Sequence, residues 1–105
     1  MLIFAHRGAS GNFPENTTSA FEAALEANID GIELDVQSCA DDFVIIHDSW
    51  LDRTTNGHGR VVNTPFSEIN KLDAGLGQTV LNLQQVLTLI GKRTAINLEL
   101  KHTFN

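Results

Sequence analysis

Two short apolar runs in this chain end in residues of the kinds that transfer protons and bind phosphate. Leu2–Ala5 is followed by His6 and Arg7, and the run at 43–46 is followed by His47. Apolar runs of this length with glycine or polar residues behind them are typical of buried strands. In α/β barrels and open α/β sheets, the carboxyl ends of the strands carry the chemistry. The sequence therefore predicts an α/β fold with a site at that edge.

The periodicity of apolar residues predicts alternating strands and helices. Strands are expected at 2–5, 31–37 and 94–100, and a helix at 83–90, where Gly91 ends the apolar stripe. Strands and helices that alternate in this way favour a parallel sheet. Three parallel strands are fewer than half of those in an eight-stranded barrel, which typically needs about 250 residues.

A further helix is expected after the first strand. Ser19 and Glu22 have the spacing of a capping box, and Thr17 and Thr18 are competing N-caps. Apolar residues then follow at helical spacing, with acidic residues on the opposite side. The helix should therefore pack one face against the sheet.

The strand at 31–37 has two chemically different faces. Strict alternation places Ile32, Leu34 and Val36 on one face and polar residues on the other. The next strand, Phe43–Ile46, follows too closely for a parallel crossover, so the two should form an antiparallel hairpin. Folding back in this way would bring His47 close to the level of Asp35.

Length and composition indicate one small globular domain. The chain has 105 residues, and its 42% apolar content is ordinary for a folded protein. Residues 1–105 are interpreted as a single unit with an insertion at about 49–80, a stretch rich in glycine and polar residues. A short helix over 67–72 is expected inside this insertion because Pro65 favours a first helical turn.

The charge of the chain excludes several classes of partner. A net charge of −6 argues against nucleic acid and anionic membrane surfaces, which bind basic faces. No apolar run approaches the roughly 18 residues of a membrane helix, and the start lacks a basic segment typical of signal peptides. Cys39 is the single cysteine, so no intrachain disulfide can form. We expect no stable membrane insertion and a cytoplasmic location.

Glu33 and Asp35 form a candidate metal site. The two carboxylates lie on one face of a strand, roughly 6.6 Å apart along it. An inward acidic face is costly unless something neutralises it, and Mg²⁺ or Ca²⁺ prefers such oxygen ligands. Glu99 is a natural third ligand from the next strand. The alternatives are an exposed sheet face or ion pairs with Arg7 or Lys101.

The two histidines are candidates for proton transfer. His6 and His47 can act as base and acid in phosphoryl transfer, with Arg7 as a bidentate clamp on phosphate. Glu15 would orient one histidine or contact the substrate. The alternatives are a structural role for a histidine at a strand end and solvent exposure for Glu15.

Together these motifs resemble the N-terminal part of the glycerophosphodiester phosphodiesterase family. The matching stretches, in family order, are Ala5–Gly8, Pro14–Thr17, Gly31–Val36, His47–Asp48, Leu51–Gly57 and Asn97–Lys101. Six linked matches are far more specific than any one of them. The chain departs from the family where Asn82 replaces a frequent threonine, and where Asp73–Leu81 is short.

The resemblance implies a (β/α)₈ TIM barrel, of which this chain would be about the first three parallel strands. It implies hydrolysis of glycerophosphodiesters to glycerol 3-phosphate and an alcohol, within glycerophospholipid metabolism. The implied site residues are His6 and His47 as the acid/base pair, Glu33, Asp35 and Glu99 as ligands of Mg²⁺ or Ca²⁺, Arg7 and Lys101 on phosphate, and Glu15 in the same site.

Two competing interpretations remain open at this point. The chain could be a catalytically silent, truncated homologue that binds metal, phosphate or a partner chain. It could also resemble a phospholipase-type barrel, which its acidic charge disfavours. In a partial barrel the strands at 2–5 and 94–100 would each leave an open edge, so self-association and inactivity of the isolated chain are expected.

Overall fold

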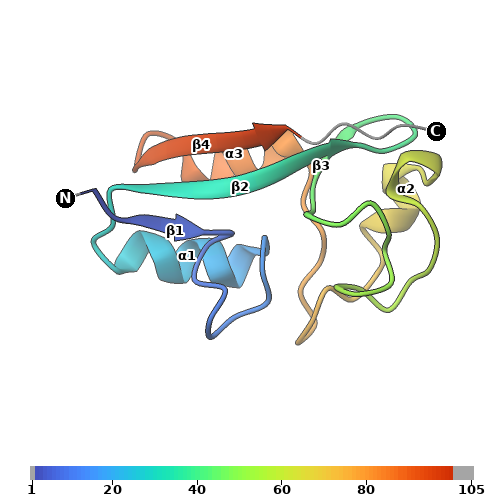
Figure 1. The fold of residues 1–105 in the computed structure, drawn as a ribbon, viewed down its shortest axis with the longest axis horizontal. Coiled ribbons are helices and arrows are strands. Elements are labelled where there is room, and N and C mark those ends of the chain that lie inside the picture. Colours follow the sequence, from blue (N-terminus) through green and yellow to red (C-terminus); the bar gives the residue numbers. More distant parts are fainter. Residues whose placement is uncertain (1, 101–105) are drawn as a thin grey trace.

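The computed structural model describes residues 2–100 and shows a mixed sheet with helices on one face. The elements, in chain order, are β1 (Phe4–His6), α1 (Thr18–Glu26), β2 (Gly31–Ser38), β3 (Phe43–Ile45), the 3₁₀ helix η1 (Val61–Asn63), α2 (Phe66–Ile69), α3 (Leu83–Ile90) and β4 (Ala95–Leu100) (Figure 1). The expected order of strands and helices is therefore confirmed within these residues.

Strand β2 is the centre of the sheet. It pairs in parallel with β1 and with β4, and its last residues pair with β3 in the expected antiparallel hairpin. Val36 has Ile45 and Leu100 as its two partners, so β3 and β4 lie on opposite edges of β2. In the same way, Ile32 lies between β1 and β4. Strands β1 and β3 therefore follow each other along one edge.

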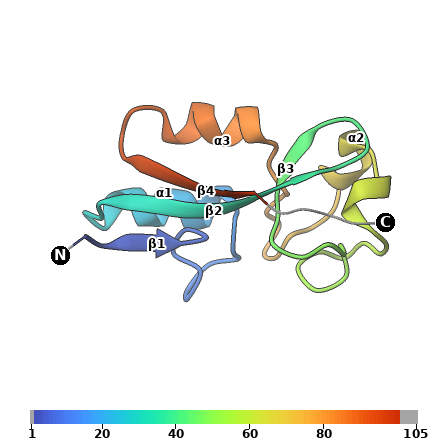
Figure 2. The ribbon, with the colours of Figure 1, turned by 45° about the horizontal axis from the view of Figure 1, so that its top comes forward.

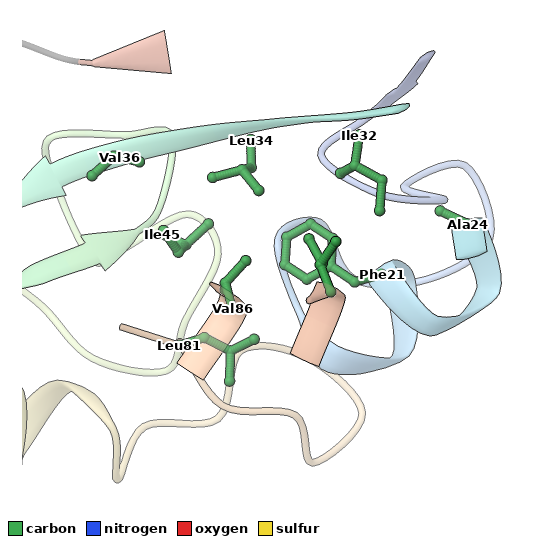
Figure 3. Close-up of a cluster of buried hydrophobic side chains, with 9 residues drawn as sticks. Phe21, Ala24, Ile32, Leu34, Val36, Ile45, Leu81 and Val86 are labelled. Atoms are coloured by element: carbon green, nitrogen blue, oxygen red, sulfur yellow. The ribbon is translucent and has the colours of Figure 1, made fainter. Parts of the chain in front are cut away.

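The main core lies between β2 and the two long helices. Ile32, Leu34 and Val36 are buried, as their alternation predicts, and they point at Phe21 of α1 and Val86 of α3 (Figure 3). Helix α3 covers the sheet and contacts α1 (Figure 2). The polar face of β2 is consequently left on the side of the sheet away from the helices.

The two helices begin differently. Asn82 caps α3 with a complete capping box, because its side chain accepts from the Gln85 amide at 2.8 Å and its own amide donates to the Gln85 side chain at 2.9 Å. The box expected at Ser19 and Glu22 is wrong. Helix α1 has Thr17 as its N-cap, and the Thr17 hydroxyl donates instead to the carbonyl of Pro14 at 2.6 Å.

The segment at 46–82 lies beyond the carboxyl end of β2 (Figure 1). It has an apolar cluster of its own, in which Leu51, Val61 and Ile69 are fully buried. Helix α2 is shorter than the expected helix and starts one residue earlier, immediately after Pro65. This segment is thus a folded lobe packed at the end of the sheet where the candidate site residues lie.

Candidate active site at the carboxyl ends of the strands

The polar face of the sheet carries acidic residues in rows across the strands. His6, Glu33 and Asn97 are partners across β1, β2 and β4, and Asp35 is the partner of Glu99. Partners in parallel strands share a face at a spacing of about 4.8 Å. The Asn97 side-chain amide donates to the Glu33 carboxylate at 3.2 Å. The expected sharing of one face by the three acidic residues is therefore observed in the register.

A sharp turn after β1 directs Arg7 into the site. Arg7 has a φ of 58° and Gly8 a φ of 77°, both in the left-handed region. A Cβ atom at Gly8 would lie 2.8 Å from the backbone carbon of Ala20, so this position requires glycine. The Arg7 guanidinium lies 3.2 Å from a carboxylate oxygen of Asp35 and 3.2 Å from one of Glu15.

Asp35 is a buried carboxylate with polar partners. Its residue is only 1% exposed, and its carboxylate accepts from the Asn16 side-chain amide at 3.1 Å and pairs with Arg7. Asn16 is held in turn by its backbone amide, which donates to the Arg7 carbonyl at 3.0 Å. A buried charge is tolerated only with such partners. The loop after β1 therefore neutralises the acidic centre of β2.

His47 is placed by β2. The Ile46 amide donates to the Asp35 carbonyl at 3.1 Å, so the hairpin brings His47 next to the level of Asp35, as expected. The buried Gln37 side chain lies 2.9 Å from the carbonyls of Ile46 and His47 and 2.6 Å from that of Asp48. Gln37 therefore fixes the backbone that presents the histidine.

Asp48 orients the His47 ring. The His47 Nδ1 atom lies 2.9 Å from an Asp48 carboxylate oxygen. An ionised carboxylate can only accept, so the hydrogen sits on Nδ1 of the neutral ring and Nε2 is left to exchange a proton. Arg53 donates hydrogen bonds to Asp48 at 2.7 and 2.9 Å, and this contact lowers the Asp48 pKa from 3.8 to about 2.

Arg53 also reaches the loop after β1. Its two terminal nitrogens each donate to the Glu15 carboxylate at 3.1 Å, and its contacts with Asp48 and Glu15 raise its own pKa. Sequence reasoning missed Arg53 as a site residue. The signal is present in the sequence, because Arg53 lies in the matching Leu51–Gly57 stretch, but the glycine- and polar-rich composition of the segment favours an insertion.

Charged side chains thus join two loops in one continuous network. It runs from Asp35 through Arg7, Glu15, Arg53 and Asp48 to His47. Of the expected site residues, the network includes Asp35, Arg7, Glu15 and His47. His6 is exposed at the end of β1, beside Glu33 in the sheet register, and Lys101 lies outside the described residues.

The carboxylates fit a hard divalent cation in their chemistry and their common face. Glu33, Asp35 and Glu99 supply oxygen donors from two paired strands. In residues 2–100, no three His, Cys, Asp or Glu side chains come close enough together to hold a metal ion. The carboxylates of Glu33 and Asp35 are engaged by amide and guanidinium groups instead. The metal site therefore stays a prediction.

The Asp48 carboxylate should make stability depend on pH in acid. Its folded pKa lies below the ordinary 3.8, so its contribution is complete above about pH 4 and is lost as the pH falls towards 2. Over that window, we expect the free energy of unfolding of the full-length protein to fall by at most about 1 kcal/mol more than that of an Asp48→Asn variant. The difference is small because the ion pair between Asp48 and Arg53 is partly exposed. Urea unfolding from pH 5 to pH 2 measures the difference. If the two proteins showed the same dependence of stability on pH, the lowered pKa of Asp48 would be contradicted.

The sequence matches the model of the glycerophosphoryl diester phosphodiesterase family over residues 6–104. A glycerophosphodiester phosphodiesterase of Caldanaerobacter subterraneus is 49% identical over 109 residues, which cover 95% of this chain and 45% of that protein. One of Bacillus altitudinis is 45% identical, with coverage of 96% and 45%. The chain thus spans less than half the length of these relatives.

Two solved structures have closely similar folds. The glycerophosphodiester phosphodiesterase of Agrobacterium tumefaciens has a TM-score of 0.93 and 43% identity, covering 97% of this chain and 48% of that one. A phosphodiesterase of Oleispira antarctica, solved with the product sn-glycerol-3-phosphate, has a TM-score of 0.92 and 37% identity, with coverage of 96% and 44%. In the residues that the structure describes, no helix is long and apolar enough to cross a membrane.

Proposed function

The chain belongs to the glycerophosphoryl diester phosphodiesterase family, and we propose that the full-length protein hydrolyses glycerophosphodiesters to glycerol 3-phosphate and an alcohol. The observation that carries the proposal is the network from Asp35 to His47, which joins motif residues from strand β2 and from two loops. The Oleispira antarctica relative was solved with glycerol 3-phosphate as its product, which supports the substrate class.

We propose that the described sheet is the first part of a (β/α)₈ barrel. Three parallel strands with helices on one face are the repeating units of that fold, and the relatives are about twice as long as this chain. The segment at about 49–80 would then be an insertion after the second strand that covers the carboxyl ends. Unpaired outer edges of β1 and β4 would favour self-association of the isolated 105 residues.

In this proposal Glu33, Asp35 and Glu99 hold Mg²⁺ or Ca²⁺. When bound, such an ion polarises a phosphoryl oxygen and makes a hydroxyl or water more acidic. The register of β2 and β4 pairs Asp35 with Glu99, and Glu33 lies two residues before Asp35 on the same face. Arg7, whose guanidinium lies between Asp35 and Glu15, would compensate charge on the phosphodiester, together with Lys101.

His6 and His47 are the proposed proton-transfer residues. One takes the proton of the attacking oxygen, from water or from the glycerol 2-hydroxyl, and the other protonates the departing alkoxide. His47 suits either role because Asp48 fixes its ring and leaves Nε2 to face the reaction. His6 ends β1 beside Glu33, on the same face of the sheet. We further propose a cytoplasmic enzyme of glycerophospholipid metabolism.

Substrate assays on the full-length protein test the proposal. We expect glycerophosphocholine or glycerophosphoethanolamine to release glycerol 3-phosphate in the presence of Mg²⁺ or Ca²⁺, and simple phosphomonoesters to react poorly, because the family that the chain belongs to is one of diester hydrolases. Enzymatic quantification of glycerol 3-phosphate measures the first reaction and inorganic phosphate the second. Comparable rates on monoesters would indicate a phosphatase. No turnover by a folded protein would favour the catalytically silent homologue.

A further inference from the structure

We infer that Arg53 is a positioning residue that sets the orientation of His47 through Asp48 and ties the lobe at 46–82 to the loop after β1. This inference rests on the proposed function of the same site. The guanidinium donates four hydrogen bonds, two to Asp48 and two to Glu15. Arginine carries five N–H groups in a rigid fork, so its donors are almost fully used by these two carboxylates.

The geometry gives Arg53 one partner close in sequence and one distant. Asp48 lies five residues before it, whereas Glu15 lies 38 residues before it in the loop that follows β1. Arg7 binds the opposite side of the network through the same Glu15 carboxylate at 3.2 Å. Arg53 is therefore a direct side-chain link between the loop that carries Arg7 and the loop that carries His47.

The charge of Arg53 acts on the partner of the histidine. Its hydrogen bonds are the largest cause of the lowered pKa of Asp48, so Asp48 remains an anion throughout the physiological range. An anchored carboxylate on Nδ1 holds His47 in one tautomer and one ring orientation. Without Arg53, the Asp48 side chain regains rotamer freedom and the ring loses that constraint.

A direct contact with substrate is the competing role for Arg53. The residue lines a shallow groove of about 340 Å³, with Thr54 and Asp73 among the other lining residues. The structure favours positioning because all three guanidinium nitrogens are engaged by carboxylates. A residue that bound substrate would act mainly on KM, whereas a residue that orients a proton-transfer group acts mainly on kcat.

The test compares Arg53→Gln and Arg53→Lys with the unmodified full-length protein. We expect Arg53→Gln to lower kcat roughly 10- to 100-fold with little change in KM, a loss of the size seen when the outer partner that orients a metal-bound histidine is removed. Arg53→Lys keeps the charge but loses the bidentate contacts with Asp48 and Glu15. Its kcat should therefore lie between that of Arg53→Gln and that of the unmodified protein. Arg93→Gln, which removes an exposed arginine elsewhere, is the matched control and should match the unmodified protein.

A second readout does not depend on turnover. ¹⁵N NMR of the His47 ring, at a pH where the ring is neutral, should show hydrogen on Nδ1 in the unmodified protein and a mixture of tautomers in Arg53→Gln. The Arg53 side chain is 51% exposed, so the melting temperature should fall by only a few degrees. This separates loss of orientation from loss of folding.

Several results would overturn the inference. In Arg53→Gln they are an unchanged kcat, a raised KM with normal kcat, and an unchanged tautomer of His47. Full wild-type values in Arg53→Lys would also contradict it, because charge alone would then suffice. If the unmodified protein shows no turnover, the proposed function fails instead, and the tautomer comparison still decides the role of Arg53.

Discussion

Replacing either His6 or His47 with alanine in the full-length protein is expected to lower kcat by roughly 10²- to 10⁴-fold, the usual loss for a general acid or base. His47 has its Nδ1 held at 2.9 Å from Asp48, and His6 lies at the end of β1 beside Glu33. Removing either ring takes away one proton transfer and leaves the phosphate-binding groups in place. Steady-state release of glycerol 3-phosphate measures kcat and KM.

A surface histidine provides the matched control for this experiment. The His58 side chain is 86% exposed and pairs with Asp52 away from the network, so His58→Ala should retain the normal kcat. A kcat near that of the unmodified protein in His6→Ala or His47→Ala would exclude the role assigned to that residue. Loss in all three variants would indicate a general effect of histidine removal on folding, which melting curves would detect.

The parts of the site that lie on strands could be predicted because burial imposes a period of two. One face of β2 must supply Ile32, Leu34 and Val36 to the core, and this forces Glu33 and Asp35 to the opposite face. The short connection between β2 and β3 requires a hairpin, and the hairpin brings His47 next to the level of Asp35 whatever contacts the side chains make. The periodicity of apolar residues is therefore sufficient to predict which face carries the site residues wherever a strand packs its other face against the helices.

The parts of the site that lie on loops could not be predicted in this way. Arg7 and Asn16 have φ angles of 58° and 57°, in the left-handed region. The periodicity of apolar residues does not predict where a left-handed residue will turn a side chain into the site. Arg53 reaches Glu15 across 38 residues of sequence. Thr17, one of the candidate N-caps, is the N-cap of α1, but its side chain does not cap the helix. Its hydroxyl donates to the Pro14 carbonyl instead, because a threonine side chain can bond to a nearby carbonyl as well as to a helix end.

Removing divalent cations from the full-length protein is expected to abolish turnover, and adding Mg²⁺ or Ca²⁺ should restore it. Asp35 and Glu99 are partners in the sheet and Glu33 lies two residues before Asp35 on the same face. Three carboxylates on one face repel each other, and a bound cation would relieve that repulsion as well as polarise the substrate. Glu33→Ala should raise the concentration of metal needed for half-maximal activity.

Direct binding measurements make this expectation independent of catalysis. Calorimetric titration with Ca²⁺ should show weaker binding to Glu33→Ala than to the unmodified protein, whereas Glu26→Ala removes an exposed glutamate of α1 and should leave binding unchanged. A ligand present at 100 times its Kd stabilises the folded state by about 2.7 kcal/mol, so Ca²⁺ should also raise the melting temperature. Full activity in protein verified to be free of metal would contradict the proposed site. The burial of Asp35 would then rest on protein partners such as Arg7 and Asn16, and the carboxylates of β2 would serve the fold rather than the reaction.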